Sequence, residues 1–152
     1  MAKKKPGKTT PPSLAEKVHH LFGAVRSPEG DEYTHQEVAS ALQTAGGPTI
    51  SATYVWQLRK GIRDNPTKHH IEALADFFGV APSYFFDEEA GQRIDAELDL
   101  LVAVRDPSVR ALALAADGLS EATLDAVRAI IDNARQLEGL PTVRTNSKAK
   151  GR

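Results

Sequence analysis

The stretch that decides the fold is Ile50–Pro66, ISATYVWQLRKGIRDNP. It predicts a short helix with one buried face, because Val55 and Leu58 lie three residues apart on a single stripe. Ser51 is a favoured N-cap residue, and Gly61 suits the position just beyond a helix end. The remaining side of this helix is therefore free to meet something outside the protein.

That outer side begins with small and amide-bearing residues and ends with cations, an order that suits the major groove of DNA. Thr53 and Gln57 can meet base edges, whereas Lys60 and Arg63 can reach phosphates. The alternative is an ordinary surface helix whose charges are only solvated.

Composition narrows the class of protein. The chain has 152 residues, of which 41% are hydrophobic, so a real core is possible. It has no cysteine, which excludes disulfides, thiolate zinc sites and cysteine nucleophiles and fits a reducing cytosol. The sequence shows neither a membrane span nor the apolar region of a signal peptide. We expect a soluble cytoplasmic protein.

The net charge of −1 hides a strong asymmetry. Residues 1–12 carry four lysines and no acid, the tail 142–152 carries four further cations, and the region between them has a charge of −9. Within that region, residues 34–70 have a charge of +2. Near-neutrality is thus no argument against a nucleic-acid partner. We expect residues 1–12 to be a disordered basic arm and residues 142–152 a disordered basic tail.

Four more elements are predicted around the central helix. Ser13 caps a helix that carries Leu14, Val18, Leu21, Phe22 and Val25 at helical spacing. Thr34 and Glu37 form the capping box of a second helix, and Thr67 caps another that ends at Gly79. Residues 82–86 form an aromatic turn, in which Tyr84 and Phe85 favour the core over a role as stacking platforms.

Several of these positions resemble one family in register. The residues are THQEVA at 34–39, VWQLRKG at 55–61 and NP at 65–66, and the similarity covers about Leu14 to Phe86. The chain resembles the Cro/CI (XRE) helix-turn-helix family of DNA-binding proteins. This resemblance implies a lambda-repressor-like domain of five helices. The chain departs from the family pattern in a longer turn, which contains Gly46–Gly47–Pro48, and in an exposed Trp56.

The resemblance also implies which side chains touch DNA. It places His35 and Gln36 near phosphates and turns four residues of the central helix toward the groove. Trp56 either contacts thymine methyls or folds back onto the long turn. The candidate base contacts are Ser51, Ala52, Thr53, Trp56 and Gln57, and the candidate phosphate contacts are His35, Gln36, Arg59, Lys60, Arg63 and Lys68.

The C-terminal half is predicted to hold three amphipathic helices. About fifty residues make a thin core alone, so their apolar stripes need partners. A second copy of the chain is favoured, and packing within one chain is the alternative. We expect a DNA-binding domain at 13–87 and a small three-helix dimerisation domain at 88–141. The candidate dimerisation residues are Ile94, Leu98, Leu101, Val102, Leu124, Val127 and Ile131.

The long turn and the C-terminal extension are similar to a narrower group, the nucleoid-associated regulators of mycobacteria. That similarity spans about Leu14 to Leu140. It implies an actinobacterial protein with a C-terminal dimerisation domain.

Enzyme chemistry is not indicated. The pairs His19–His20 and His69–His70 are adjacent, and neighbours on a helix point in different directions, so neither pair is a chelating site. Residues 87–89, DEE, lack the spacing of a calcium loop and are interpreted as a linker and an acidic helix start. We expect no catalytic residues, no metal and no cofactor.

Two other functions stay open. One is a protein-interaction adaptor, or an antitoxin-like partner, that uses the helix-turn-helix scaffold to bind protein. Tyr54 and Trp56 favour it, because aromatic residues are enriched at protein interfaces, and so does the acidic C-terminal half. The other is a ligand-sensing repressor with a pocket between the C-terminal helices, which no motif of the sequence requires.

Overall fold

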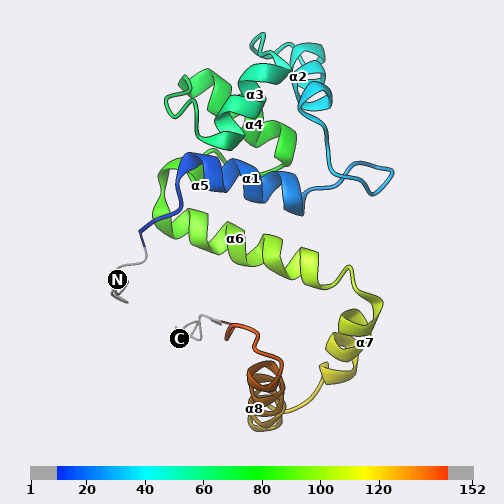
Figure 1. The fold of residues 1–152 in the computed structure, drawn as a ribbon. Helices are drawn as coiled ribbons and strands as arrows, with labels where there is room; N and C mark the ends of the chain where they lie inside the picture. The colour runs from blue at the N-terminus through cyan, green and yellow to red at the C-terminus, as the bar shows by residue number, and fades with distance from the viewer. Residues whose placement is uncertain (1–9, 144–152) are drawn as a thin grey trace. The chain divides into compact units, whose positions relative to one another are not determined.

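The computed structural model describes residues 10–143, and most of the predicted basic arm and tail lie outside these residues. The described residues form eight helices and no strand, which confirms the all-α prediction (Figure 1). The helices are α1 (Leu14–Ala24), α2 (His35–Thr44), α3 (Ala52–Lys60), α4 (Lys68–Phe78), α5 (Ser83–Phe86), α6 (Glu88–Ala103), α7 (Pro107–Ala116) and α8 (Glu121–Leu137).

The helix ends follow the predicted capping residues. Ser13 and Thr34 each form a full capping box with the glutamate three positions on, at α1 and α2. Ser51, Thr67 and Ser120 cap α3, α4 and α8 with their hydroxyl oxygens. These local signals depend on only a few neighbouring residues, so they are legible in the sequence.

Gly61 ends α3 in the left-handed conformation, at a φ of 76°. Its amide donates to the carbonyl of Leu58, and the amide of Ile62 donates to the carbonyl of Gln57 at 2.9 Å. This pair of bonds is a Schellman motif, which satisfies carbonyls that the helix end leaves open.

The chain divides into two compact units, residues 1–105 and residues 106–152. The first unit includes α6, so it extends beyond the predicted domain boundary at Asp87. The predicted three-helix C-terminal domain therefore keeps only α7 and α8 in the second unit.

The core of the first unit is built around α1, which packs against α3 on one side and α6 on the other (Figure 1). Leu21 and Phe22 of α1 are fully buried, as are Val55 and Leu58 of α3. The predicted stripe of α3 is thus confirmed as core. Tyr84 of α5 is also fully buried, in agreement with the core role expected for it.

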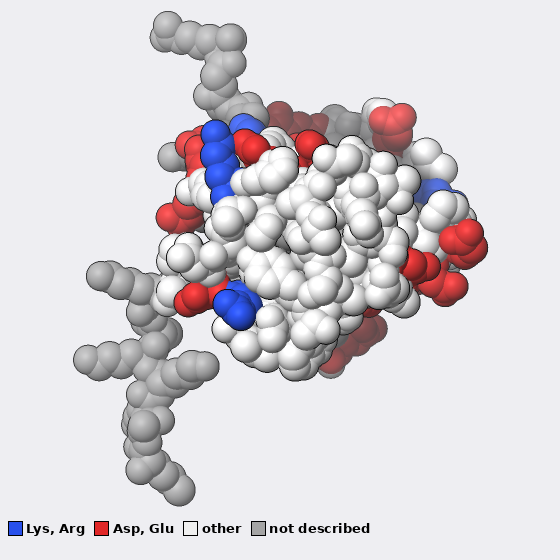
Figure 2. Space-filling model, turned by 90° about the horizontal axis from the view of Figure 1, so that it is seen from above, with Lys and Arg blue, Asp and Glu red and all other residues white. Residues whose placement is uncertain are grey.

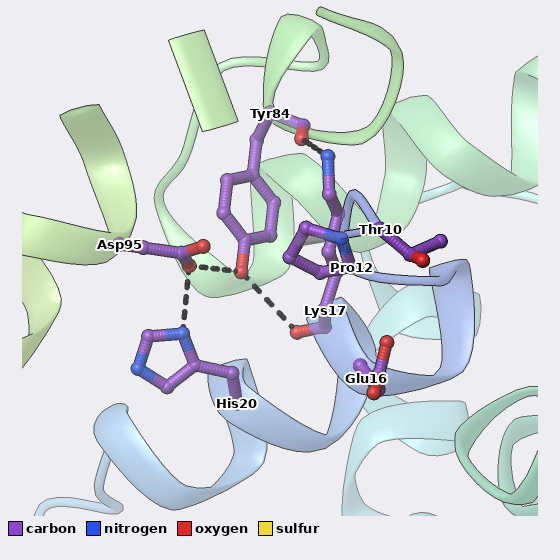
Figure 3. Close-up of a pocket in the computed structure, with 7 residues that line it drawn as sticks. All are labelled: Thr10, Pro12, Glu16, Lys17, His20, Tyr84 and Asp95. Atoms are coloured by element: carbon purple, nitrogen blue, oxygen red, sulfur yellow. Dashed lines mark hydrogen bonds and ion pairs between the residues drawn. The ribbon is translucent and has the colours of Figure 1, made fainter. Parts of the chain in front are cut away.

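A polar network joins α1 to α5 and α6 (Figure 3). The ammonium of Lys17, whose residue is only 7% exposed, donates to the carbonyl of Tyr84 at 2.6 Å. The Tyr84 hydroxyl donates to Asp95 at 2.7 Å. His20 lies 2.7 Å from Asp95 through Nδ1 and 2.9 Å from Asp99 through Nε2. Burial, and then the bond to Asp95, raise the pKa of Tyr84 far above its ordinary value, so the hydroxyl remains a donor.

Gly91 permits the close approach of α6 to this network. A Cβ atom at this position would lie 3.0 Å from the Lys17 ammonium nitrogen and 3.1 Å from the Tyr84 carbonyl oxygen. Because the carbonyl belongs to the backbone, a side chain here would push α6 outward. The absence of a side chain therefore determines how closely α6 packs.

Two of the predicted dimerisation residues are covered by the same chain. Leu98 is buried in the core of the first unit, and Ile94 packs against that core. This differs from the expectation that they meet a second copy. Their apolar character can be seen in the sequence, but the element against which they pack depends on the tertiary fold.

The second unit has a different character. No residue of α7 or α8 is buried, and large apolar side chains are exposed on both helices. The exposed residues include Val109, Leu112, Leu114, Leu124, Ile130, Ile131 and Leu137. The exposed part of their hydrophobic area gains no stabilisation within the single chain.

We predict opposite effects of two glycine substitutions. Gly61→Ala should destabilise the protein by about 1 kcal/mol, because a side chain is strained at positive φ. Gly23→Ala should stabilise it by about 0.4–1 kcal/mol, because Gly23 lies in α1 with open space around it. Urea unfolding of both variants would measure this. Equal changes would contradict the role given to Gly61.

Candidate nucleic-acid interface

The α3 helix presents a buried face and an outer face. Val55 and Leu58 point into the core, whereas Ser51, Thr53 and Trp56 are exposed. The Ser51 hydroxyl accepts from the amide of Tyr54 at 3.1 Å and keeps its own proton for another acceptor. Ala52 and Gln57 are half-buried, and Ala52 packs against the core. Of the candidate base contacts, Ser51, Thr53 and Trp56 are therefore the exposed ones.

Trp56 is 40% exposed, which is a large fraction for a tryptophan, a residue that is usually mostly buried. The neighbouring Tyr54 is engaged inside the protein instead. Its hydroxyl lies 3.2 Å from Nδ1 of His70, and the two rings meet edge to face at 5.2 Å. Of the two aromatic residues that favour a protein partner, only Trp56 thus remains on the outer face.

Two cations follow the outer face of α3. Lys60 and Arg63 are both exposed, and the Arg63 amide donates to the carbonyl of Gln57 at 3.2 Å. The Schellman motif thus extends to Arg63 and holds the backbone that carries these two side chains. Both side chains remain candidate phosphate contacts.

Arg59 differs from the phosphate contact predicted for it. Its side chain is 13% exposed and pairs with Glu32 at 2.6 Å. Its guanidinium lies 4.4 Å from the centre of the Phe22 ring, and Nε donates to Nδ1 of His19 at 3.1 Å. The guanidinium faces α1 and the loop before α2, because these groups satisfy its charge and its flat surface.

His35, at the start of α2, lies beside this arginine. Its Nε2 is 3.5 Å from the guanidinium, and its ring is 5.2 Å from that of Phe22. Burial, and then the charge of Arg59, lower the pKa of His35 below its ordinary value; Lys60 adds to this effect and Glu32 opposes it. His35 is therefore a neutral imidazole near pH 7, and its role at a phosphate would be that of a hydrogen-bond donor.

The remaining candidate phosphate contacts lie near helix N-termini. Gln36 is exposed in the first turn of α2 and donates to the Ser40 hydroxyl at 3.0 Å. Lys68 is exposed in the first turn of α4 and lies 3.6 Å from Glu72, a distance typical of a weak surface pair. Free amides at such helix ends favour anions. Both side chains can exchange their surface partners for a phosphate.

Charge is unevenly distributed over this side of the first unit. Figure 2 looks down from the side on which α2, α3 and α4 lie in Figure 1, and the middle of the visible surface is neither basic nor acidic. Side chains of both charges, Lys and Arg as well as Asp and Glu, stand toward its edges. The neutral centre suits a surface that reads base edges, and phosphates would have to be held by the individual cations at its margin.

The sequence did not identify Glu32 as the partner of Arg59. Glu32 lies in a loop, 27 positions before Arg59, and no local spacing rule connects a loop residue to a helix that distant. The contacts of Arg59 with an aromatic ring and two imidazoles could not be predicted from the sequence either. The one available signal was the position of Arg59 next to Leu58, on the boundary between the two faces of α3.

Among residues 10–143, no cluster of three or more His, Asp or Glu side chains could hold a metal ion. The adjacent His19 and His20 contact different partners, Arg59 and the pair Asp95 and Asp99. None of the helices in this described part is long and apolar enough to cross a membrane.

We predict that His35 makes the protein less stable in mild acid. The unfolded chain takes up a proton near the ordinary histidine value of 6.5, whereas the folded protein, with its lower pKa, resists it. The free energy of unfolding should therefore fall as the pH drops below that value. Thermal unfolding of His35→Gln, which retains an acceptor for Arg59, should show a flatter pH profile. His69→Gln, at an exposed site on α4, is the control and should follow wild type.

Comparison with known proteins gives a relationship over most of the chain. No family model matches it. The chain is 40% identical over 128 residues to the nucleoid-associated protein EspR of Mycobacterium tuberculosis, in both strain CDC 1551 / Oshkosh and strain H37Rv. The match covers 84% of this chain and 96% of EspR. At this identity and coverage, the chain belongs to the family of the nucleoid-associated protein EspR.

Proposed function

We propose that this protein binds double-stranded DNA as a nucleoid-associated protein or transcriptional regulator, with α3 in the major groove. The observation that carries the proposal is the two-sided α3. Val55 and Leu58 anchor it to the core, while Thr53, Trp56 and Gln57 lie on or beside the outer face. The kinship with a nucleoid-associated protein supports the same assignment.

In this proposal, α2 and α3 form a helix-turn-helix of the Cro/CI type. An α-helix fits the major groove, where each base pair has a distinct pattern of donors and acceptors. Gln57 offers both an acceptor and donors to a base edge, and the Thr53 methyl suits the methyl group of thymine. The proposed base contacts are Ser51, Ala52, Thr53, Trp56 and Gln57.

The proposed phosphate contacts surround this centre. Lys60 ends α3 and Arg63 follows it, Gln36 and neutral His35 open α2, and Lys68 opens α4. These groups come from three helices, so they would fix the orientation of the protein on the duplex without reading its sequence.

We further propose that two chains associate through the exposed apolar side chains of the C-terminal part. Leu124, Val127 and Ile131 recur at helical spacing on α8, and none is buried within the chain. Leu101 and Val102, near the end of α6, are also exposed. A second copy with the same stripe would cover this area. A dimer with two DNA-binding domains suits DNA with two half-sites.

The alternative of a protein partner rests on Trp56 alone within the outer face. The exposed cations Lys60, Arg63 and Lys68 favour DNA instead, since a duplex presents closely spaced phosphates. Binding to a random-sequence duplex at low salt separates the two functions. A folded, full-length protein that binds no duplex would favour the protein partner.

We predict that two substitutions on α3 affect DNA binding differently. Gln57→Ala should lose about 1–3 kcal/mol on a selected site and relax the base preference there. Lys60→Ala should weaken binding to all sequences alike and reduce the slope of log affinity against log salt by about one. Fluorescence anisotropy with selected and random duplexes measures both effects. Gln92→Ala, on exposed α6 surface, is the control and should match wild type.

We predict that the mass in solution depends on the α8 stripe. The wild-type protein should have twice the chain mass of 16.4 kDa in light scattering after size exclusion. Ile131→Asp should give the single-chain mass, because a charge in a shared apolar contact is costly. Asn133→Asp, which adds a charge on the opposite side of α8, should stay dimeric. A dimeric Ile131→Asp variant would show that association uses another surface.

A further inference from the structure

Arg59 lies on the proposed recognition helix, yet its guanidinium is directed into the protein. Four groups surround it: the Glu32 carboxylate at 2.6 Å, the face of Phe22 at 4.4 Å, His19 at 3.1 Å and His35 at 3.5 Å. Two of these come from α1, one from the loop between α1 and α2, and one from the first residue of α2. A single side chain of α3 thus contacts α1, α2 and the loop that joins them.

Glu32 is held in place before it meets Arg59. The loop around it is closed by a bond from the Ser27 amide to the Asp31 carbonyl at 2.8 Å, and Glu32 forms an isolated bridge with Arg26. The next residue, Tyr33, packs its ring against Phe77 of α4 at 5.0 Å. The backbone at Glu32 is therefore held in place, while its side chain is 40% exposed and meets the Arg59 guanidinium at 2.6 Å.

A switch of Arg59 to a phosphate would be unfavourable. The guanidinium would leave the aromatic face and the acceptors, and the Glu32 carboxylate would stay unpaired close to the DNA backbone. Like charges at that distance repel each other. A lysine could not replace the present arrangement, because it lacks the flat fork that bonds Glu32 and His19 while stacking on Phe22.

We propose that Arg59 is a positioning residue, which with Glu32 fixes the angle of α3 relative to the start of α2, rather than a residue that binds DNA. The inference rests on the proposed function, because it explains how base-reading and phosphate-binding groups on different helices are held in one geometry. In this arrangement Glu32, an acid, supports the binding of a polyanion. Removal of its charge should therefore weaken DNA binding, which is the reverse of the usual electrostatic effect.

The test is the affinity of the full-length protein for a random-sequence duplex, measured by anisotropy at several salt concentrations. The variants are Arg59→Met, Arg59→Lys, Glu32→Gln and the double variant Arg59→Met/Glu32→Gln. Glu29→Gln is the matched control, since it removes an exposed acid from the same loop. Circular dichroism and thermal unfolding identify the temperature at which every variant is folded, and binding is measured there.

A positioning role has a specific signature. Arg59→Met, Arg59→Lys and Glu32→Gln should each weaken binding on the order of 2- to 30-fold, with the salt slope unchanged. The double variant should be no weaker than the worse single variant, because both changes break the same contact. Glu29→Gln should bind as well as wild type or slightly better. If Arg59→Met fails to fold, the isosteric Glu32→Gln decides the question.

A phosphate contact has the opposite signature. Arg59→Met would then reduce the salt slope by about one, Arg59→Lys would bind almost as well as wild type, and Glu32→Gln would bind more tightly. Any of these results would overturn the positioning role and leave the proposed function intact. If all four variants bound DNA as tightly as wild type, the positioning role would also be overturned. A wild-type protein that binds no duplex would instead overturn the proposed function, and this inference with it.

Discussion

The packing of α1 between α3 and α6 is the constraint on which the first unit depends. A helix buried on two sides must be apolar on most of its circumference, and Val18, Leu21 and Phe22 are 1% exposed or less. The one charged residue in this layer, Lys17, is tolerated because its ammonium has a carbonyl partner and an aromatic face. All buried side-chain nitrogen and oxygen atoms among the described residues have partners. The α3 helix therefore packs on a core whose buried polar groups are all satisfied.

Phe22 has a double role in this support. One edge of its ring meets Phe78 of α4 at 5.2 Å, which closes the core, while its face carries the guanidinium of Arg59. The same side chain thus links hydrophobic packing to the orientation of α3. If α3 reads DNA as proposed, changes to Phe22 that loosen the core should also disturb the outer face of α3.

The sequence predicted the elements well and the partners of long-range contacts less well. Caps such as Thr34 and Ser51, and the glycine end of α3, act through a few neighbouring residues, so they could be predicted from the sequence. The inward turn of Arg59 was not, because it depends on a loop acid 27 positions away. The grouping of α6 with the first unit differs from the predicted domain boundary for a similar reason. The apolar stripe of α6 suits either a second chain or α1, and only the tertiary fold decides between them.

Gly91 illustrates how a missing group can determine geometry. A helix that touches its neighbour through a bare Cα can rotate or slide very little, since a shift in either direction brings the Cβ of another residue into the same space. The register of α6 is thus locked near its beginning, and the chain just beyond its far end is tied by the Arg105 side chain, which donates to the carbonyl of Ala24. The first unit ends at Arg105, and Asp106 then caps α7. The position of this exit point consequently depends on the absence of a side chain at Gly91.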